Sequence, residues 1–286
     1  MTRYLLRTAL YVPAAHEKPA HKADFLGADA VILDLEDSVA PDQKNAARKT
    51  LADLPPAQQA LRVIRVNAAG TPWHEDDITA AVKLQPHAVL LPKVNAQEDV
   101  WAFKRLIALQ RPQAPVSLWA MIETAAGVLN ASAIAAALGA QGALVMGLND
   151  LGKETGMAQV AGRLPMAAAL SMTVLAARAH GVVVLDGVFN ALDDPDGFAA
   201  ECQQGRSFGF DGKTLIHPRQ IATANAVFAP QPDELAEARR IVEAFARPEN
   251  IGKGVIALGG KMVERLHLDM AEAVLAKAGR IAQANN

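Results

Sequence analysis

The sequence predicts an α/β protein, a (β/α)8 TIM barrel with a C-terminal helical extension. A short aliphatic segment, a polar or glycine stop and an alanine-rich helical segment recur about eight times along the chain. The aliphatic segments are continuously apolar, as expected for parallel strands that are covered on both faces. The chain has 286 residues, which suits one barrel of about 250 residues with a small appendage.

The predicted strands are short and regularly spaced. They are Ala9–Val12, Ala30–Asp34, Arg62–Val66, Ala88–Leu91, Ser117–Ile122, Ala143–Met146, Val182–Leu185 and Thr214–Ile216. The predicted helices between them include Gln43–Leu51, Glu98–Leu109, Ala131–Leu138, Ala167–His180 and Asp194–Gln204. An open doubly wound sheet is the alternative, because it is built from the same βαβ units. No G-x-G-x-x-G follows the first strand, which argues against a dinucleotide-binding sheet.

The character of the chain changes near Pro230. We expect residues 1–230 to form the barrel and residues 231–286 to form the extension. Within the extension, Asp233–Phe245 and Val263–Gln283 are predicted helices, and four glycines punctuate an irregular stretch between them. These glycines suit a hinged lid, and an ordinary packed tail is the alternative.

Composition excludes several classes of protein. Hydrophobic residues make up 51% of the chain and charged residues 20%, with a net charge of −2. This balance gives no reason to expect nucleic acid or an anionic membrane as a partner, and no segment approaches the ~20 apolar residues of a membrane span. Cys202 is the only cysteine. A disulfide within the chain is therefore excluded, a reducing cytoplasmic location is expected, and a buried structural thiol is favoured over a catalytic one.

The residues that follow the predicted strands, where the chemistry of such barrels takes place, are polar after all strands but the first. They are Pro13, Asp34, Glu36, Asp37, Arg65, Asn67, Lys93, Glu123, Asn149, Asp150, Asp186 and His217. A chain that used these positions only for packing would not place ionisable groups at so many of them.

Glu123 and Asp150 follow neighbouring strands, so their carboxylates can converge. Two hard oxygen ligands with room for water and substrate oxygens are typical of a Mg²⁺ site. The alternative is that both residues cap helices or form ion pairs.

Arg65 ends an apolar strand, and its planar guanidinium suits a carboxylate. An internal ion pair with Glu36 or Asp37 is the alternative. We expect those two acids to position Arg65 and metal-bound water from behind, although direct metal binding is also open.

Two other acidic clusters have simpler explanations. His74–Asp77 and Asp193–Gly197 both lie where a helix is expected to begin. Acidic residues in a first turn are stabilised by the helix dipole, so we interpret both clusters as helix starts.

Short motifs spread over nearly the whole chain resemble the citrate lyase β-subunit-like branch of the HpcH/HpaI aldolase family, which includes malyl-CoA and citramalyl-CoA lyases. The motifs are Leu10–Pro13, Gly27–Pro41 with Lys44 and Arg48, Arg65–Asn67, Leu91–Lys93, Ile122–Thr124, Gly147–Leu151, Gly209–Lys213, Ile216–Pro218 and Gly260–Val263. Their order and spacing match the family from end to end.

The resemblance implies that Glu123 and Asp150 bind Mg²⁺ and that Arg65 binds the carboxylate of a 2-keto acid. It also implies a coenzyme A path lined by a further group of residues. These are Tyr11, Lys18, Lys22, Ile216 and His217. Relatives usually carry aspartate after Lys-Met-Val as an acid–base that closes over a neighbouring subunit. Here the residue is Glu264, which is the corresponding catalytic candidate although its side chain is one methylene longer. Pro13-Ala14 also departs from the Pro-Gly found in many relatives.

The resemblance therefore implies a Mg²⁺-dependent carbon–carbon lyase that splits or forms a 3-hydroxyacyl-CoA thioester, with a 2-keto acid and an acyl-CoA as partners. A malyl-, methylmalyl- or citramalyl-CoA-like substrate is expected, as is a homo-oligomer, either a trimer or a hexamer. One alternative is a class II pyruvate aldolase that acts on free hydroxy-keto acids. Another is a citrate lyase complex subunit or a non-catalytic ligand-binding relative.

Overall fold

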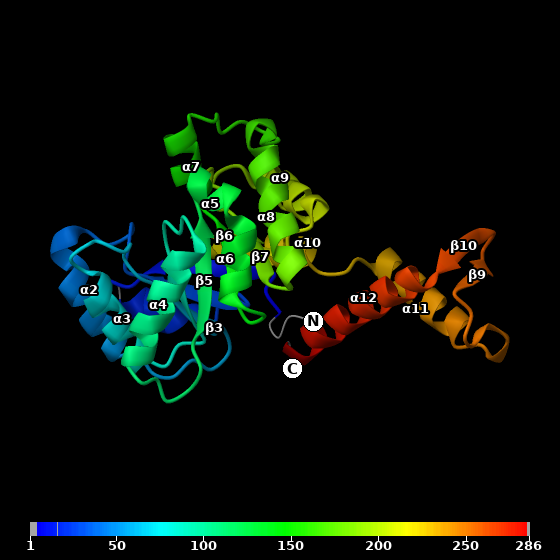
Figure 1. Ribbon diagram of the computed structural model, residues 1–286, viewed down its shortest axis with the longest axis horizontal. Coiled ribbons are helices and arrows are strands. Elements are labelled where there is room, and N and C mark those ends of the chain that lie inside the picture. Colours follow the sequence, from blue (N-terminus) through cyan, green and yellow to red (C-terminus); the bar gives the residue numbers. More distant parts are fainter. Residues whose placement is uncertain (1–4, 16, 285–286) are drawn as a thin grey trace. The chain divides into compact units, whose positions relative to one another are not determined.

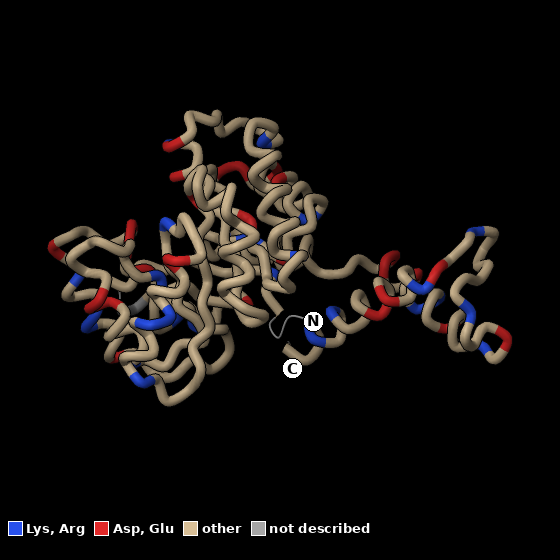
Figure 2. Tube along the Cα trace, in the orientation of Figure 1, with Lys and Arg blue, Asp and Glu red and all other residues tan. Residues whose placement is uncertain are grey.

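The computed structural model describes residues 5–15 and 17–284, without the side chains of Glu17 and Lys18. It divides into two compact units, residues 1–225 and residues 226–286. No described helix is long and apolar enough to cross a membrane. Figure 2 shows acidic and basic residues interspersed along the trace of both units.

Eight parallel strands close into a barrel in the order in which they occur in the chain, and Figure 1 shows helices packed around them. The strands are β1 (Thr8–Pro13), β2 (Ala30–Asp34), β3 (Leu61–Arg65), β4 (Ala88–Leu91), β5 (Ser117–Ile122), β6 (Ala143–Met146), β7 (Val183–Asp186) and β8 (Gly212–Leu215). The last strand pairs with the first through Ala9 and Thr214. The predicted barrel is confirmed, and the open sheet is wrong.

Helices cover the outside of the barrel. They are α1 (Glu17–Ala23), α2 (Lys44–Ala52), α3 (His74–Lys83), α4 (Gln97–Leu109), α5 (Ala125–Leu129), α6 (Ala131–Leu138), α7 (Leu148–Thr155), α8 (Ala167–His180), α9 (Pro195–Phe208) and α10 (Ile221–Val227). Both acidic clusters lie at helix starts as predicted: α3 begins at His74, and Asp194 caps α9 by accepting a hydrogen bond from the Gly197 amide at 2.9 Å.

Helix α7 differs from the prediction, which placed Asp150 on a loop after its strand. Asp150 lies in the first turn of this eight-residue helix, which ends at Gly156 in a left-handed conformation. The segment contains Gly152 and has only eight residues, which is too short for a helical repeat to be recognised from the sequence. The helix begins where the chain leaves β6 and turns Asp150 toward the barrel mouth.

Alternate residues of each strand point into the barrel, as the period of two requires. The inward set forms one buried cluster that includes Ala9, Ile32, Val63 and Trp119. Continuing this alternation to the carboxyl ends of the strands brings further side chains to the barrel mouth. These are Tyr11, Asp34, Arg65, Met121 and Glu123. The period-two alternation of the strands therefore places most side chains of the site at the barrel mouth.

The C-terminal unit contains α11 (Pro232–Phe245), β9 (Val255–Leu258), β10 (Lys261–Glu264) and α12 (Arg265–Ala284). The stretch predicted as irregular is an antiparallel hairpin. Its turn, Gly259-Gly260, has positive φ at both residues, as the tight turns of hairpins require. The final helix accordingly begins at Arg265, and not at Val263.

The C-terminal unit has a small core of its own. Ala244, Phe245, Ile256 and Val263 form a small buried cluster. The hairpin contributes two of these side chains, Ile256 and Val263. The sequence analysis predicted neither strand of the hairpin.

Candidate active site

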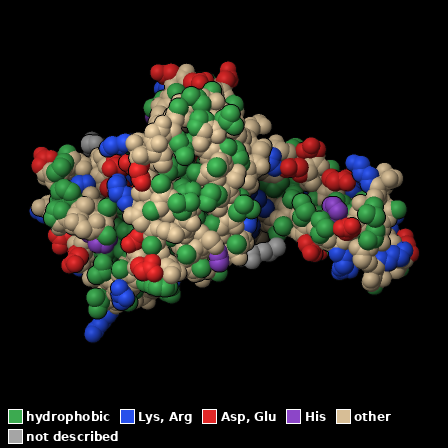
Figure 3. All heavy atoms as spheres, turned by 45° about the horizontal axis from the view of Figure 1, so that its top comes forward, with side chains coloured by type: hydrophobic (Ala, Val, Ile, Leu, Met, Phe, Trp, Pro, Cys, Tyr) green, Lys and Arg blue, Asp and Glu red, His purple; other side chains and the backbone are tan. Residues whose placement is uncertain are grey.

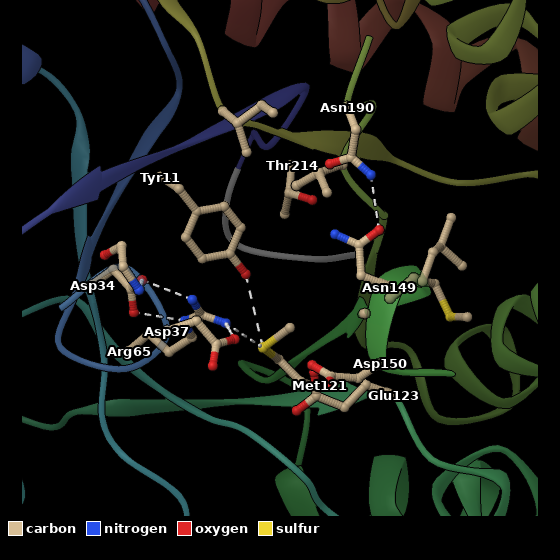
Figure 4. A pocket seen from close by; sticks show the side chains of 16 residues that line it. Tyr11, Asp34, Asp37, Arg65, Met121, Glu123, Asn149, Asp150, Asn190 and Thr214 are labelled. Carbon is tan, nitrogen blue, oxygen red and sulfur yellow. Dashed lines mark hydrogen bonds and ion pairs between the residues drawn. The ribbon is translucent and has the colours of Figure 1, made fainter. Parts of the chain in front are cut away.

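A cavity of about 320 Å³ opens at the carboxyl ends of the barrel strands. Figure 4 shows Arg65 and Tyr11 on one side of it, with Glu123 and Asp150 next to each other on the other side. Its lining comes from β1, β2, β3, β5, β6 and β8, from the start of α7, and from loops that follow the strands, including the one after β7. The structure thus brings the predicted metal ligands and the predicted arginine into one space.

Arg65 is held by Asp34, its partner in the pairing of β2 with β3. Its Nε and Nη2 atoms each donate to one Asp34 oxygen at 2.7 Å. Burial raises the pKa of Asp34, but the Arg65 charge and hydrogen bonds outweigh it, and the pKa is lowered. The Tyr11 ring packs over the guanidinium at 4.9 Å. This bidentate pair fixes the plane of Arg65.

The remaining Arg65 nitrogen, Nη1, faces two further acids. It lies 3.1 Å from Glu36 Oε2 and 3.4 Å from Asp37 Oδ2. Glu36 is buried, and Asp37 is exposed. The predicted ion pairs therefore exist, yet the main partner is Asp34, which the sequence analysis placed among the strand-end residues without giving it a role.

Glu123 follows β5 and is almost completely buried. Its Oε1 accepts a hydrogen bond of 2.6 Å from the Lys93 amide, while its Oε2 is buried without a hydrogen-bond partner. Burial first, and then the charges of Glu36 and Asp150, raise the pKa of Glu123 to about 8. The amide and the charge of Lys93 lower this pKa, but they do not offset the increase caused by burial and by the neighbouring acids.

Asp150 reaches the same cavity from α7. Its side chain is 35% exposed, and Oδ2 lies 4.0 Å from the Lys93 ammonium. It is the more accessible of the two acids, and it raises the pKa of Glu123 through its charge. The two carboxylates therefore lie close enough to repel each other.

These residues fit a hard divalent cation. The orphaned Glu123 Oε2 and the neighbouring Asp150 offer carboxylate oxygens, the ligand type that Mg²⁺ prefers. The Glu123 side chain lies directly against Gly147. A Cβ at position 147 would lie 2.5 Å from Glu123 Cβ and 2.6 Å from its Oε2, so only glycine leaves room for this carboxylate. Within the described residues, no group of three or more His, Cys, Asp or Glu side chains is arranged to hold a metal. A two-ligand site leaves positions for water and substrate.

Residues 7–218 match the HpcH/HpaI aldolase/citrate lyase family. The chain belongs to this family. It is 47% identical over 279 residues to a (3S)-malyl-CoA thioesterase of Cereibacter sphaeroides, covering 96% of this chain and 95% of that relative. It is 34% identical to an L-malyl-CoA/beta-methylmalyl-CoA lyase of the same species, covering 94% and 92%.

A solved structure gives a further match within the HpcH/HpaI family. The protein CitE from Mycobacterium tuberculosis, in complex with magnesium, acetoacetate and coenzyme A, is 33% identical and superposes with a TM-score of 0.78. The match covers 96% of this chain and 100% of that one. The predicted family and the predicted enzyme class, a carbon–carbon lyase, are confirmed.

The residues expected along a coenzyme A path of the HpcH/HpaI type are only partly gathered. Tyr11 and Ile216 line the cavity. His217 is half-buried outside its lining and accepts a hydrogen bond from the Arg219 amide. Lys22 is exposed in the last turn of α1, and the Lys18 side chain lies outside the described residues. Glu264 belongs to β10 of the C-terminal unit.

Lys44 holds a segment next to the site in place, and the sequence analysis gave it no role. Its ammonium is buried and donates to Leu35 O and Glu36 O at 2.7 Å and to Asn67 Oδ1 at 2.8 Å. It thereby holds the segment that carries Glu36. Helical spacing could have revealed it, because Lys44 shares the buried face of α2 with Ala47 and Leu51.

Asp186 is a strand-end acid that does not reach the cavity lining. It is fully buried and pairs with Arg163 Nη1 at 2.7 Å and with Lys213 Nζ at 3.1 Å. Lys213 also contacts Glu201 of α9 at 2.8 Å. This network joins the barrel to its helices. Cys202 is buried beside it, and burial raises the pKa of its thiol to about 12, which fits the expected structural role.

Proposed function

We propose that this enzyme acts on a short 3-hydroxyacyl-CoA thioester of the malyl-CoA type, with Mg²⁺, by cleaving or forming its carbon–carbon bond. One observation carries the proposal. A fixed guanidinium, Arg65, faces two carboxylates, Glu123 and Asp150, across one cavity. This is a charge pattern for an anionic keto acid beside a divalent cation.

The roles of the residues follow from their positions. Arg65, oriented by Asp34, would bind the carboxylate of the 2-keto acid portion. Glu123 and Asp150 would hold the Mg²⁺, which supplies Lewis-acid stabilisation of the oxygen that changes between hydroxyl and keto form. Glu36 and Asp37 would keep Arg65 in place. Glu264, from a neighbouring chain, would move the proton at the carbon next to the thioester.

Relatives support the choice of substrate and cofactor. The lyase with 34% identity is named for L-malyl-CoA and beta-methylmalyl-CoA. The Mycobacterium tuberculosis structure contains magnesium, acetoacetate and coenzyme A. We therefore propose that coenzyme A enters past Ile216 and His217, with Lys18 and Lys22 near its phosphates and Tyr11 at the inner end. Lysines suit phosphates as flexible point charges.

Thioester hydrolysis is a second candidate for the same substrate. The observation that favours it is the 47% identity with a (3S)-malyl-CoA thioesterase over nearly the full length of both chains. The substitution of glutamate for the expected aspartate at Glu264 points in the same direction, since an extra methylene displaces the acid and can lower the rate of carbon–carbon cleavage by ~10²-fold.

A homo-oligomer, a trimer or a hexamer, is part of the proposal, because Glu264 would serve a neighbouring chain. Figure 3 shows hydrophobic side chains gathered on the visible surface of the barrel unit. Large apolar side chains are exposed on adjoining elements of this unit, α5, α8 and the turn before α8. They include Leu129, Leu164, Met172 and Leu175. Exposed apolar side chains in such number suit a protein interface.

The test is to incubate the purified chain with Mg²⁺ and (3S)-malyl-CoA. Cleavage releases glyoxylate and acetyl-CoA, whereas hydrolysis releases malate and the free thiol of coenzyme A. Glu123→Ala and Asp150→Ala should abolish either activity, while Glu75→Ala, which removes an exposed acid at the start of α3, should leave it intact.

Full activity in excess chelator would contradict the proposal. Turnover of a free hydroxy-keto acid without affinity for coenzyme A thioesters would identify a pyruvate aldolase instead. A chain that is inactive alone but active with partner subunits would identify a component of a citrate lyase complex.

A further inference from the structure

Lys93 adopts a conformation that is unusual for its residue type. It follows β4, and its φ of 53° lies in the left-handed region. Residues with a side chain are strained there, and glycine is not. A lysine at this position therefore indicates that its side chain contributes something that glycine would lack.

The left-handed conformation lets Lys93 make two different contacts. Its backbone amide donates to Glu123 Oε1 at 2.6 Å. Its ammonium lies 3.1 Å from Glu36 Oε1 and 4.0 Å from Asp150 Oδ2. One residue thus touches acids that follow β2 and β5 and an acid on α7. Glycine would preserve the amide contact alone.

The charges explain what the ammonium adds. Arg65 is paired with Asp34 and also contacts Glu36, whereas the positive charge that acts on Glu123 and lies nearest to Asp150 is that of Lys93. Five carboxylates, those of Asp34, Glu36, Asp37, Glu123 and Asp150, then share two cations, Arg65 and Lys93, so negative charge is in excess when all are ionised. Such an excess favours a bound divalent cation.

We propose that Lys93 is a positioning residue and a built-in counter-cation of the metal site. Its amide aims Glu123 at the cavity, and its ammonium holds Glu36 and Asp150 apart from Glu123 until a divalent cation binds. The cation must compete with this ammonium, so Lys93 lowers the affinity of the site for metal. The inference rests on the proposed metal ligands, Glu123 and Asp150.

The test measures Mn²⁺ binding to the metal-free protein, with free Mn²⁺ counted by electron paramagnetic resonance. Mn²⁺ prefers the same carboxylate ligands as Mg²⁺. Lys93→Met removes the ammonium and should tighten Mn²⁺ binding by at least about tenfold. Lys93→Arg retains a positive charge and should stay close to the wild type. Lys153→Met is the matched control, because it removes an exposed lysine from α7, the helix that carries Asp150.

Lys93→Gly covers the case in which Lys93→Met does not fold, because glycine relieves the left-handed strain and retains the amide. It should also bind Mn²⁺ more tightly. Unchanged or weaker binding in a folded variant without the ammonium would overturn the inference, since loss of a merely structural ion pair would not increase affinity. Absence of Mn²⁺ binding by the wild type would instead overturn the proposed metal site.

Discussion

Arg65 is fixed in orientation by Asp34, and this fixed guanidinium is the proposed anion-binding group of the site. The pair occupies neighbouring positions in the register of β2 and β3. Its two hydrogen bonds of 2.7 Å use Nε and Nη2, while Nη1 faces Glu36 and Asp37. Across the cavity, Glu123 has the opposite situation. It is buried, it is close to other acids, and its Oε2 has no partner. At the scale of single residues, a guanidinium with its partners in place faces a carboxyl group whose Oε2 has no hydrogen-bond partner.

Metal binding should release a proton from Glu123. Its pKa of about 8 means that the metal-free protein holds this proton at pH 7, whereas a ligand to Mg²⁺ must be ionised. We expect about one proton released per Mg²⁺ at pH 7, and an affinity that rises with pH until about pH 8 and then levels off. Calorimetry in buffers of different ionisation enthalpy measures this release. An affinity independent of pH between 6 and 8 would contradict it.

The elements next to the site are held by buried polar networks. Lys44 anchors the segment after β2 through three hydrogen bonds to buried oxygen atoms. Asn67 extends this contact to Asp77 through its side-chain amide at 2.6 Å. On the other side of the barrel, Asp186 ties β7 to β8 and to Arg163. Both networks lie outside the cavity, and each maintains the position of whole elements.

Lys44→Met should lower both stability and turnover. The change leaves buried carbonyl groups without a donor, which destabilises the fold by about 1–3 kcal/mol. Displacement of the Glu36 segment should reduce kcat by about tenfold or more. Lys49→Met, on the exposed side of the same helix, is the control. Urea denaturation and steady-state kinetics measure the two effects, and a variant with wild-type kcat would show that the segment is held by other contacts.

Asp186→Asn should destabilise the protein by about 3–5 kcal/mol at pH 7, because it leaves Arg163 and Lys213 buried without their shared carboxylate. Burial raises the pKa of Asp186, but Lys213 and Arg163 lower it further, and the net shift is downward. Its contribution is therefore present above the unfolded pKa of about 4 and is lost as pH falls through the lower, folded pKa.

The difference in unfolding free energy between wild type and Asp186→Asn should accordingly be constant from pH 7 to pH 5 and shrink only in stronger acid. Denaturation curves at several pH values provide the measurement. Asp193→Asn, an exposed acid before α9, should show little change at any pH. If the difference in unfolding free energy instead grew as pH fell, the pKa of Asp186 would not be lowered in the folded protein, contrary to the shift given above.

The whole molecule consists of a barrel unit with Arg65, Glu123 and Asp150 and a C-terminal unit with Glu264. The hairpin and the start of α12 place Glu264 at a junction, where its amide donates to His267 Nδ1 at 3.0 Å. If Glu264 serves a neighbouring chain, the catalytic groups of one site come from two copies of the protein.

Mixed oligomers test this division. Arg65→Ala and Glu264→Gln should each be nearly inactive alone. When the two variants are unfolded, mixed in equal amounts and refolded together, about a quarter of the sites should combine an intact Arg65 with an intact Glu264 from the neighbour. Recovery of activity toward (3S)-malyl-CoA measures this fraction. No recovery despite mixed oligomers, or a fully active Glu264→Gln variant, would contradict the shared site.

The sequence by itself determined the order of strands and helices and the residues that end each strand. Four strands, β2, β4, β5 and β6, begin and end as predicted. Local pattern suffices here, because continuously apolar strands followed by helices permit few other arrangements. The same pattern brings Glu123 and Arg65 to one rim, since the carboxyl ends of parallel strands share a face.

Only the tertiary structure decided which charges meet. Asp34, and not Glu36 or Asp37, is the main partner of Arg65, and Lys93 spans acids that are far apart in sequence. Asp186 ends a strand as Glu123 follows one, yet it pairs within the barrel wall. Such pairings depend on strand register, side-chain direction and burial across the closed barrel, and these are properties of contacts between segments that no local pattern contains.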